Sequence, residues 1–142
     1  MVELQNLSTK PEVKIYTKLE GQNPSGSLKD RIAKYMIESA EQSGVLTKGK
    51  TILESTSGNT GISLALVGKL KGYKVKVVMP ENVSPERTEL LSAYGAEIHY
   101  SPADGGSNTA AIVAQEMAEQ NTDYCLLYQY GNEANPRAHT RR

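Results

Sequence analysis

The sequence predicts an α/β fold: an open parallel sheet of four strands with helices on both faces, plus an N-terminal β-hairpin. Short apolar strands alternate with helical patterns from residue 51 to residue 130, as in a parallel sheet with helical crossovers. A polar segment, 55–60, separates the first of these strands from a helix that is apolar almost all round. Right-handed crossovers then favour the strand order 3-2-1-4.

Composition excludes several classes of function. The 142 residues suggest one domain, and 16 basic side chains balance 16 acidic ones without a basic stripe for nucleic acid. No apolar run approaches the ~20 residues of a membrane span, and the N-terminus has no signal-peptide pattern. The single cysteine, Cys125, has no partner for an internal disulfide. We therefore expect a cytoplasmic protein that binds neither nucleic acid nor membrane.

The chain begins with two half-polar segments, 2–7 and 13–19, that read as short strands joined by a turn at 8–11. An isolated hairpin is only marginally stable, so these strands are expected to pair with another sheet.

A turn from Asn23 leads into the first helix, which Ser25 or Ser27 is suited to cap. Lys29 falls in the first turn, where the helix dipole disfavours a cation, and Arg31 follows it. The helix dipole and Arg31 both favour the neutral form of the Lys29 amine. A neutral amine is a nucleophile that forms Schiff bases. A solvated surface lysine is the alternative. The helical spacing assigns the buried face to Leu28, Ile32, Met36, Ile37 and Ala40.

The later elements follow the same alternation. Strands are predicted at 51–54, 74–79, 96–100 and 124–129, with helices beginning at the polar loop, at Ser84 and near Thr109. Leu90, Leu91 and Tyr94 are expected to form the apolar face of the helix after Ser84. The tail from Gly131 is short and polar.

The loop 55–60 carries five hydroxyl or amide side chains and one glycine at the start of the apolar helix. A helix beginning there directs unpaired backbone N–H groups and the positive end of its dipole at a ligand. Ser57, Asn59 and Thr60 add neutral donors, which suits a carboxylate or phosphate. Helix capping is the alternative, although it needs only one or two such side chains. Gln129, at the end of the fourth strand, is expected to face the same crevice.

Two other patterns are rejected on context. Residues 44–51 match G-x-x-x-x-G-K-T, but a phosphate-binding loop must follow a strand and open a helix, whereas this one ends a helix and precedes a strand. His99 and His139 have no partner at metal-ligand spacing, so no metal site is expected.

Three segments together resemble the fold-type II pyridoxal-phosphate enzymes, specifically the cysteine synthases. They are Asn23-Pro-Ser-Gly-Ser-Leu-Lys-Asp-Arg, Ser55-Thr-Ser-Gly-Asn-Thr-Gly and Leu127-Tyr-Gln-Tyr-Gly-Asn. Tyr130 and Gly105-Gly-Ser-Asn are more similar to the cysteine synthase B branch, some of whose members use O-phosphoserine or a thiocarboxylated carrier protein.

This resemblance implies a pyridoxal 5'-phosphate cofactor held covalently by Lys29, with Asn59 bonded to the oxygen of the pyridine ring. It also implies a substrate carboxylate bound by Thr56, Ser57, Thr60 and Gln129. The implied reaction is β-replacement on an O-activated serine, O-acetylserine or O-phosphoserine, by sulfide or another sulfur donor. The alternatives are another fold-type II activity, such as cystathionine β-synthase or threonine dehydratase, and a non-catalytic binding or dimerising domain.

The resemblance also divides the chain. Residues 1–22 match a hairpin of the partner domain's sheet, and residues 23–142 match the N-terminal domain that binds cofactor and substrate. The family's glycine-rich phosphate loop and C-terminal half are not matched, so we expect an N-terminal portion of a homodimeric enzyme, inactive by itself.

Overall fold

The computed structural model describes residues 1–140 and contains the predicted parallel sheet. Its strands are β3 (Thr51–Ser55), β4 (Lys74–Pro80), β5 (Glu97–Ser101) and β6 (Tyr124–Leu126), in the spatial order β5-β4-β3-β6. All three pairings are parallel, and Thr51 of β3 lies beside Tyr124 of β6. In chain order this is 3-2-1-4, so the predicted strand order is confirmed.

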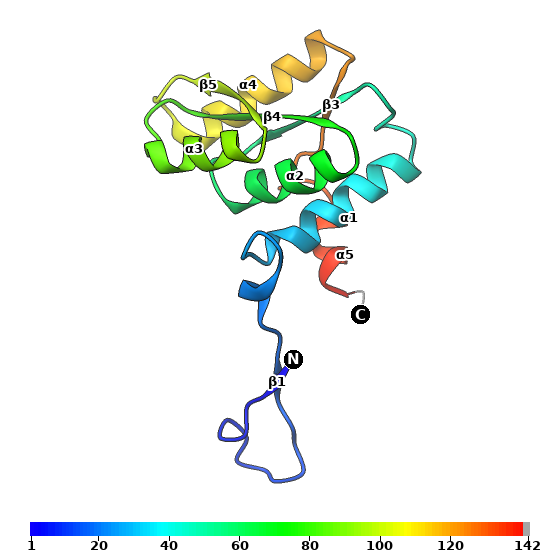
Figure 1. Cartoon of the computed structure of the whole chain (residues 1–142), viewed down its shortest axis with the longest axis vertical. Helices are drawn as coiled ribbons and strands as arrows, with labels where there is room; N and C mark the ends of the chain where they lie inside the picture. The colour runs from blue at the N-terminus through cyan, green and yellow to red at the C-terminus, as the bar shows by residue number, and fades with distance from the viewer. Residues whose placement is uncertain (141–142) are drawn as a thin grey trace.

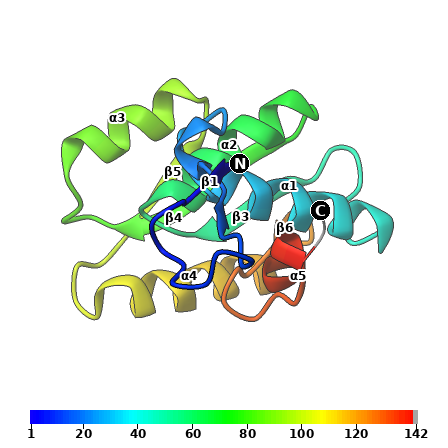
Figure 2. The same cartoon turned by 90° about the horizontal axis from the view of Figure 1, so that it is seen from below.

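Helices cover both faces of the sheet (Figure 1 and Figure 2). On one face lie α1 (Lys29–Gln42), α2 (Asn59–Leu70) and α3 (Pro85–Ala93), and on the other lies α4 (Gly106–Gln120). A large aliphatic core fills the first interface, and a smaller one around Leu53, Val78, Ala110 and Ala114 fills the second. The fold class inferred from the alternation of elements is therefore correct.

Helix α1 buries the face that its spacing predicts, with one exception. Ile32, Met36, Ile37 and Ala40 are buried, but Leu28 precedes the first turn and is 41% exposed. The helix ends just before Gly44, whose φ of 77° lies in the left-handed region that glycine adopts without strain.

Helix α2 is covered on several sides, as its uniformly apolar sequence predicts. It packs against α1, α3, β3 and β4, and residues 60–65 are all buried. Gly68 allows the close approach to β4, because a Cβ atom there would lie 2.5 Å from Val75 Cγ2. The helix that carries the polar loop is thus held rigidly against the sheet.

Four expectations about individual segments need correction. The fourth strand stops at Leu126 rather than residue 129, because Tyr128 adopts φ 50° and turns the chain away from β3. The tail contains a short helix, α5 (Ala134–Thr140), which packs on α1. Helix α4 begins at Gly106, three residues before Thr109. In α3, Leu91 is buried but Leu90 is 44% exposed. This helix packs against β5 and α2 with one face only, and the rest of it faces solvent.

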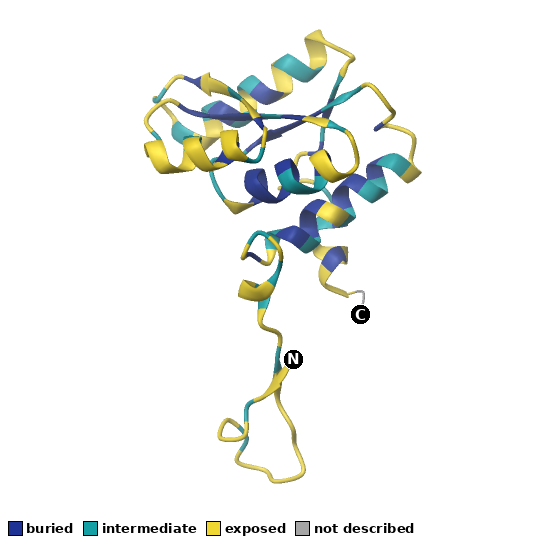
Figure 3. Cartoon of the chain, viewed as in Figure 1, coloured by how far each residue is buried: buried dark blue, intermediate teal, exposed yellow. Residues whose placement is uncertain are grey.

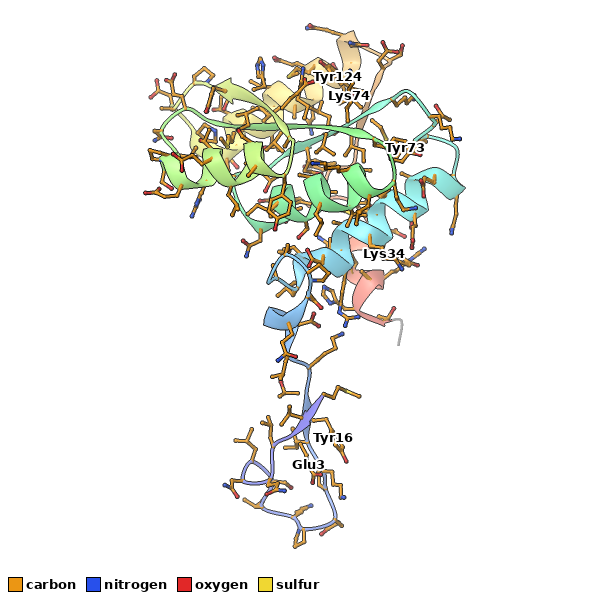
Figure 4. All side chains as sticks on the ribbon, viewed as in Figure 1. Glu3, Tyr16, Lys34, Tyr73, Lys74 and Tyr124 are labelled. Atoms are coloured by element: carbon orange, nitrogen blue, oxygen red, sulfur yellow. The ribbon has the colours of Figure 1, made fainter. Side chains whose placement is uncertain are left out.

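The N-terminal hairpin is present, but its strands are much shorter than predicted. Only β1 (Val2–Glu3) and β2 (Tyr16–Thr17) pair, antiparallel, and they pair with no other strand among the described residues. The hairpin projects from the domain as a mostly exposed arm, joined to it by a 3₁₀ turn at Glu20–Gln22 (Figure 3). Glu3 and Tyr16 mark this arm in Figure 4. Without a neighbouring sheet, nothing extends the pairing.

Residues 44–50 lie between α1 and β3, so the structure gives them the wrong context for a phosphate-binding loop. Within residues 1–140, no helix is both long and apolar enough to cross a membrane. The same residues contain no cluster of three His, Cys, Asp or Glu side chains placed to bind a metal ion.

Candidate active site

A cavity of ≈ 360 Å³ opens beyond the carboxyl ends of β3 and β4. All six side chains predicted for the site line it, and they are Lys29, Thr56, Ser57, Asn59, Thr60 and Gln129. Ser107 and Ala110 of α4, together with Val78, Pro80 and Tyr130, complete the wall. The structure therefore brings together the start of α1, the polar loop and the turn after β6, as the strand order predicts.

The start of α2 is open toward this cavity. Gly58 is the N-cap residue, and no side chain caps the helix. The backbone N–H groups of Asn59 and Thr60 have no acceptor among the described residues. Unpaired N–H groups at the positive end of a helix dipole attract an anion. The capping alternative therefore does not explain the five polar side chains.

Two of these side chains are free to bind a ligand. Neither the Ser57 hydroxyl nor the Asn59 amide makes a hydrogen bond within the described chain. Thr56 is partly occupied, because its Oγ1 accepts a hydrogen bond from the backbone N–H of Gly58 at 3.3 Å. Thr60 is fully engaged, since its hydroxyl donates to Gln129 Oε1 at 2.8 Å. Ser57 and Asn59 are thus free as both donors and acceptors, and the hydroxyl proton of Thr56 also remains available.

Gln129 lies in the turn after β6, and its side chain is buried against the loop. Its Oε1 accepts from Thr60, and its Nε2 donates to the carbonyl oxygen of Ser55 at 3.4 Å. A side-chain amide has two N–H donors, so one remains for a ligand. Gln129 therefore bridges two parts of the polar loop and also presents a donor to the cavity.

Lys29, the first residue of α1, is half-buried in the cavity wall. Its backbone N–H donates to Ser27 Oγ at 3.1 Å, and its amine pairs with no carboxylate in the described chain. The expected influence of Arg31 is not supported, because that side chain borders a different pocket and its Nε contacts Glu20 at 3.0 Å. The amine is available for a ligand.

Asp30 fixes this end of α1, although we predicted no role for it from the sequence. Its buried carboxylate accepts hydrogen bonds from the Ser25 backbone at 2.7 Å and from Ser63 of α2 at 2.6 Å, and also from the Ser25 hydroxyl. These bonds tie the turn before Lys29 to the helix that follows the polar loop. An acidic residue in the first helical turn was the available signal.

Glu54 is a second buried carboxylate that the sequence analysis overlooked. It lies in β3, directly before the polar loop, with its side chain fully buried. Burial raises its pKa to about 7, although backbone N–H groups of Gln129, Ser55 and Tyr128 oppose the rise. A carboxylate within an otherwise apolar strand was the signal for it.

Comparison with known proteins places this site in a family. Residues 1–141 match the family model described as "Pyridoxal-phosphate dependent enzyme", so the chain belongs to that family. Within it, a cysteine synthase from a Flavobacterium species is 48% identical over 139 residues, which are 98% of this chain and 45% of that protein. The chain thus spans less than half the length of the curated relatives it matches.

Solved structures agree with this assignment. The structure of O-acetyl serine sulfhydrylase isoform 3 from Entamoeba histolytica matches with a TM-score of 0.85 and 38% identity, over 97% of this chain and 43% of that one. An O-acetylserine dependent cystathionine β-synthase from Helicobacter pylori matches with a TM-score of 0.81 and 40% identity, over 89% and 41%. The fold is therefore that of the cysteine synthases.

The residues lining the cavity fit the family's cofactor, pyridoxal phosphate. The cavity offers an unpaired amine, the unpaired amide of Asn59 and unpaired donors at a helix start. The first two suit the cofactor's aldehyde and ring oxygen, and the donors at the helix start suit a carboxylate.

Proposed function

We propose that this chain supplies the lysine and the substrate-binding loop of a cysteine synthase. In this proposal the reaction is β-replacement on an O-activated serine, in which a sulfur nucleophile takes the place of an acetate or phosphate group. The observation that carries the proposal is the uncapped start of α2, whose free donors share one cavity with the unpaired amine of Lys29.

Each residue then has a defined task. Lys29 Nζ holds the cofactor, and the Asn59 amide donates to the oxygen of its ring. When bound, pyridoxal phosphate supplies the electron sink that makes the α-proton of the amino acid removable. Lys29 Nζ would accept that proton as general base.

The substrate carboxylate is assigned to the polar loop. We expect it to accept hydrogen bonds from the backbone N–H groups of Asn59 and Thr60, the Ser57 hydroxyl and the free N–H of Gln129. Thr56 donates its hydroxyl proton, which stays free because its oxygen only accepts from Gly58. Thr60 acts through its backbone, because its hydroxyl proton already serves Gln129.

We further propose that residues 1–22 belong to the sheet of a second domain, and that residues 23–142 form the domain that closes on substrate. The arm supports this division, since its two short strands have unused edges and exposed apolar side chains, Val2 and Tyr16. We expect the working assembly to be a cytoplasmic homodimer that takes sulfide or a thiocarboxylated carrier protein as sulfur donor.

Cystathionine β-synthase chemistry is the second candidate, supported by the likeness to the Helicobacter pylori protein of that name. The two candidates share the first half-reaction and differ in the sulfur nucleophile. Supplying sulfide or homocysteine together with O-acetylserine, and identifying the product, separates them.

The direct test is to incubate the chain with pyridoxal phosphate, reduce with borohydride and map the labelled lysine by mass spectrometry. We expect the label on Lys29 and little on Lys34, an exposed lysine of the same helix (Figure 4). Added before the reduction, O-acetylserine or O-phosphoserine should prevent labelling of Lys29, and the more effective one identifies the substrate. Labelling spread equally over the surface lysines would contradict the proposal.

A further inference from the structure

Glu54 is a buried carboxylate without a counter-charge. Its side chain is 0% exposed, and no lysine, arginine or histidine pairs with it among residues 1–140. It alternates with Leu53 along β3, so it faces the same side of the sheet as Ile52, toward α1 and α2. The lost hydration of such a group is offset by hydrogen bonds or by a raised pKa.

Those hydrogen bonds come from the backbone around Gln129. The Gln129 N–H donates to both carboxylate oxygens, at 3.4 and 3.2 Å, and the backbone N–H groups of Tyr128 and Ser55 contribute as well. Tyr128 has φ 50°, a conformation uncommon for a residue with a side chain. The carboxylate therefore holds a turn that the backbone does not favour by itself.

The same turn places the Gln129 amide in the cavity wall. From there Gln129 Oε1 accepts from Thr60 at 2.8 Å, and Nε2 donates to the Ser55 carbonyl at 3.4 Å. Asn135 Nδ2 donates to the Gln129 carbonyl at 2.9 Å and supports the turn from the opposite side. A chain of contacts thus runs from Glu54 through the Gln129 backbone to the polar loop.

We propose that Glu54 is a positioning residue, which does not touch substrate but holds Gln129 where it completes the carboxylate site. This inference rests on the proposed function, because it concerns the site to which that function assigns the substrate carboxylate. An ionised Glu54 only accepts hydrogen bonds and so matches the N–H groups around it. A neutral Glu54 or a glutamine directs a donor at one of them.

Several other titratable groups lie on this side of the sheet. Asp30 of α1 is bonded to Ser25 and Ser63. Cys125 of β6 has its pKa raised by burial. On α5, Arg137 pairs with Glu133 and is exposed, as is His139. None of these groups contributes to the pKa shift of Glu54, so its titration can be followed separately.

The test combines NMR with a double-mutant cycle. The carboxyl ¹³C shift of Glu54 and the backbone amide shift of Gln129 are followed from pH 5 to pH 9 in the isotope-labelled chain. O-acetyl-L-serine binding is then measured at pH 8, from amide shifts of the polar loop, for wild type, Glu54→Gln, Gln129→Ala and the double variant. Glu41→Gln, which removes a carboxylate bonded to Lys71 and Tyr73, is the control.

We expect the Gln129 amide to titrate with the same midpoint as Glu54 and to lose this titration in Glu54→Gln. Glu54→Gln should lower O-acetylserine affinity about tenfold or more, and should cost nothing further once Gln129 is alanine. Glu41→Gln should match wild type. If Glu54→Gln does not fold, Glu54→Asp serves instead, because its shortened carboxylate withdraws from the Gln129 N–H.

Two results would overturn the inference. One is a Gln129 amide shift that does not change as Glu54 titrates. The other is a Glu54→Gln substitution that lowers O-acetylserine affinity equally with and without the Gln129 side chain. A wild-type chain that shows the linked titration but binds no O-acetylserine would instead contradict the proposed function. The link between Glu54 and Gln129 would then stand.

Discussion

At the scale of single residues, this site separates side chains that stabilise the fold from side chains that are free for a ligand. Ser57 makes no hydrogen bond in the described chain, whereas Thr60 bonds to Gln129 in a buried position. Both residues belong to the same six-residue loop and were predicted to act together. Their different environments allow the ligand-binding role to be tested apart from folding.

We predict that Ser57→Ala weakens O-acetylserine binding by about 1.5–3 kcal/mol, the usual contribution of a hydrogen bond to a charged group. Its stability should stay within about 0.5 kcal/mol of wild type, because no bond within the protein is lost. Thr60→Ala should reduce both affinity and stability, since it leaves Gln129 without its donor. Calorimetric titration and urea unfolding measure the two effects, and equal stability losses for both variants would favour a purely structural loop.

We also predict that Glu54 makes stability fall as pH rises. The pKa of Glu54 is raised from 4.5 to about 7, so the folded state holds a proton that the unfolded state releases in this range. The contribution of Glu54 to stability is therefore largest below pH 4.5 and declines by about 3 kcal/mol until about pH 7.

Urea unfolding of wild type and Glu54→Gln across pH 4.5–8 tests this linkage. The difference in unfolding free energy between the two proteins should change steadily up to pH 7 and then level off. A constant difference at every pH would show that burial does not raise the pKa of Glu54.

At the scale of elements, the site depends on how closely α2 approaches the sheet. The polar loop is short, so any shift of α2 relative to β4 moves the open helix start within the cavity. Gly68 sets that distance, because its missing side chain leaves room for Val75.

Gly68→Ala should destabilise the domain by about 1–3 kcal/mol, because the added methyl group overlaps the stiff, β-branched side chain of Val75. This loss exceeds the gain of about 1 kcal/mol that alanine brings to a helix interior. Gly21→Ala is the matched control, since a Cβ atom there meets nothing within 4 Å. Thermal unfolding compares them, and a more stable Gly68→Ala protein would mean that the contact relaxes without cost.

At the scale of the whole molecule, the chain consists of a well-packed domain and a weakly held arm (Figure 1). The domain buries two aliphatic cores, whereas β1 and β2 pair only with each other over two residues each. Regions with few buried apolar contacts open far more easily than a core.

Hydrogen exchange should therefore be fast for residues 2–17 and slow for β3 and β4, with protection in β4 approaching the free energy of global unfolding. Mass spectrometry of peptides from the two regions provides the measurement. If the arm belongs to the sheet of another domain, as proposed, a longer chain containing that domain should protect it. Protection of the arm in the present chain would instead indicate pairing between copies.

The sequence by itself was sufficient for the fold class, the strand order and the grouping of the residues that line the cavity. Alternating periodicities define the elements, and chirality and connection rules restrict their arrangement. The polar loop between Glu54 and Gly61 could be recognised because it places polar side chains directly before an apolar helical pattern. Local sequence is enough to identify such a helix start. The place of Lys29 in the site was inferred from the family resemblance. The place of Gln129 was inferred from its position at the switch point of the sheet.

Tertiary structure alone decided which polar groups remain free for a ligand and which form hydrogen bonds within the protein. The pairing of Thr60 with Gln129 and the support of Gln129 by Glu54 join residues 69 and 75 positions apart. The length of β6, the helix at Ala134–Thr140 and the shortness of the hairpin strands were also not predicted from the sequence. These features depend on which residues form hydrogen bonds with buried backbone groups and with the buried carboxylate. Such partners are distant in the chain, and local sequence patterns carry no information about them.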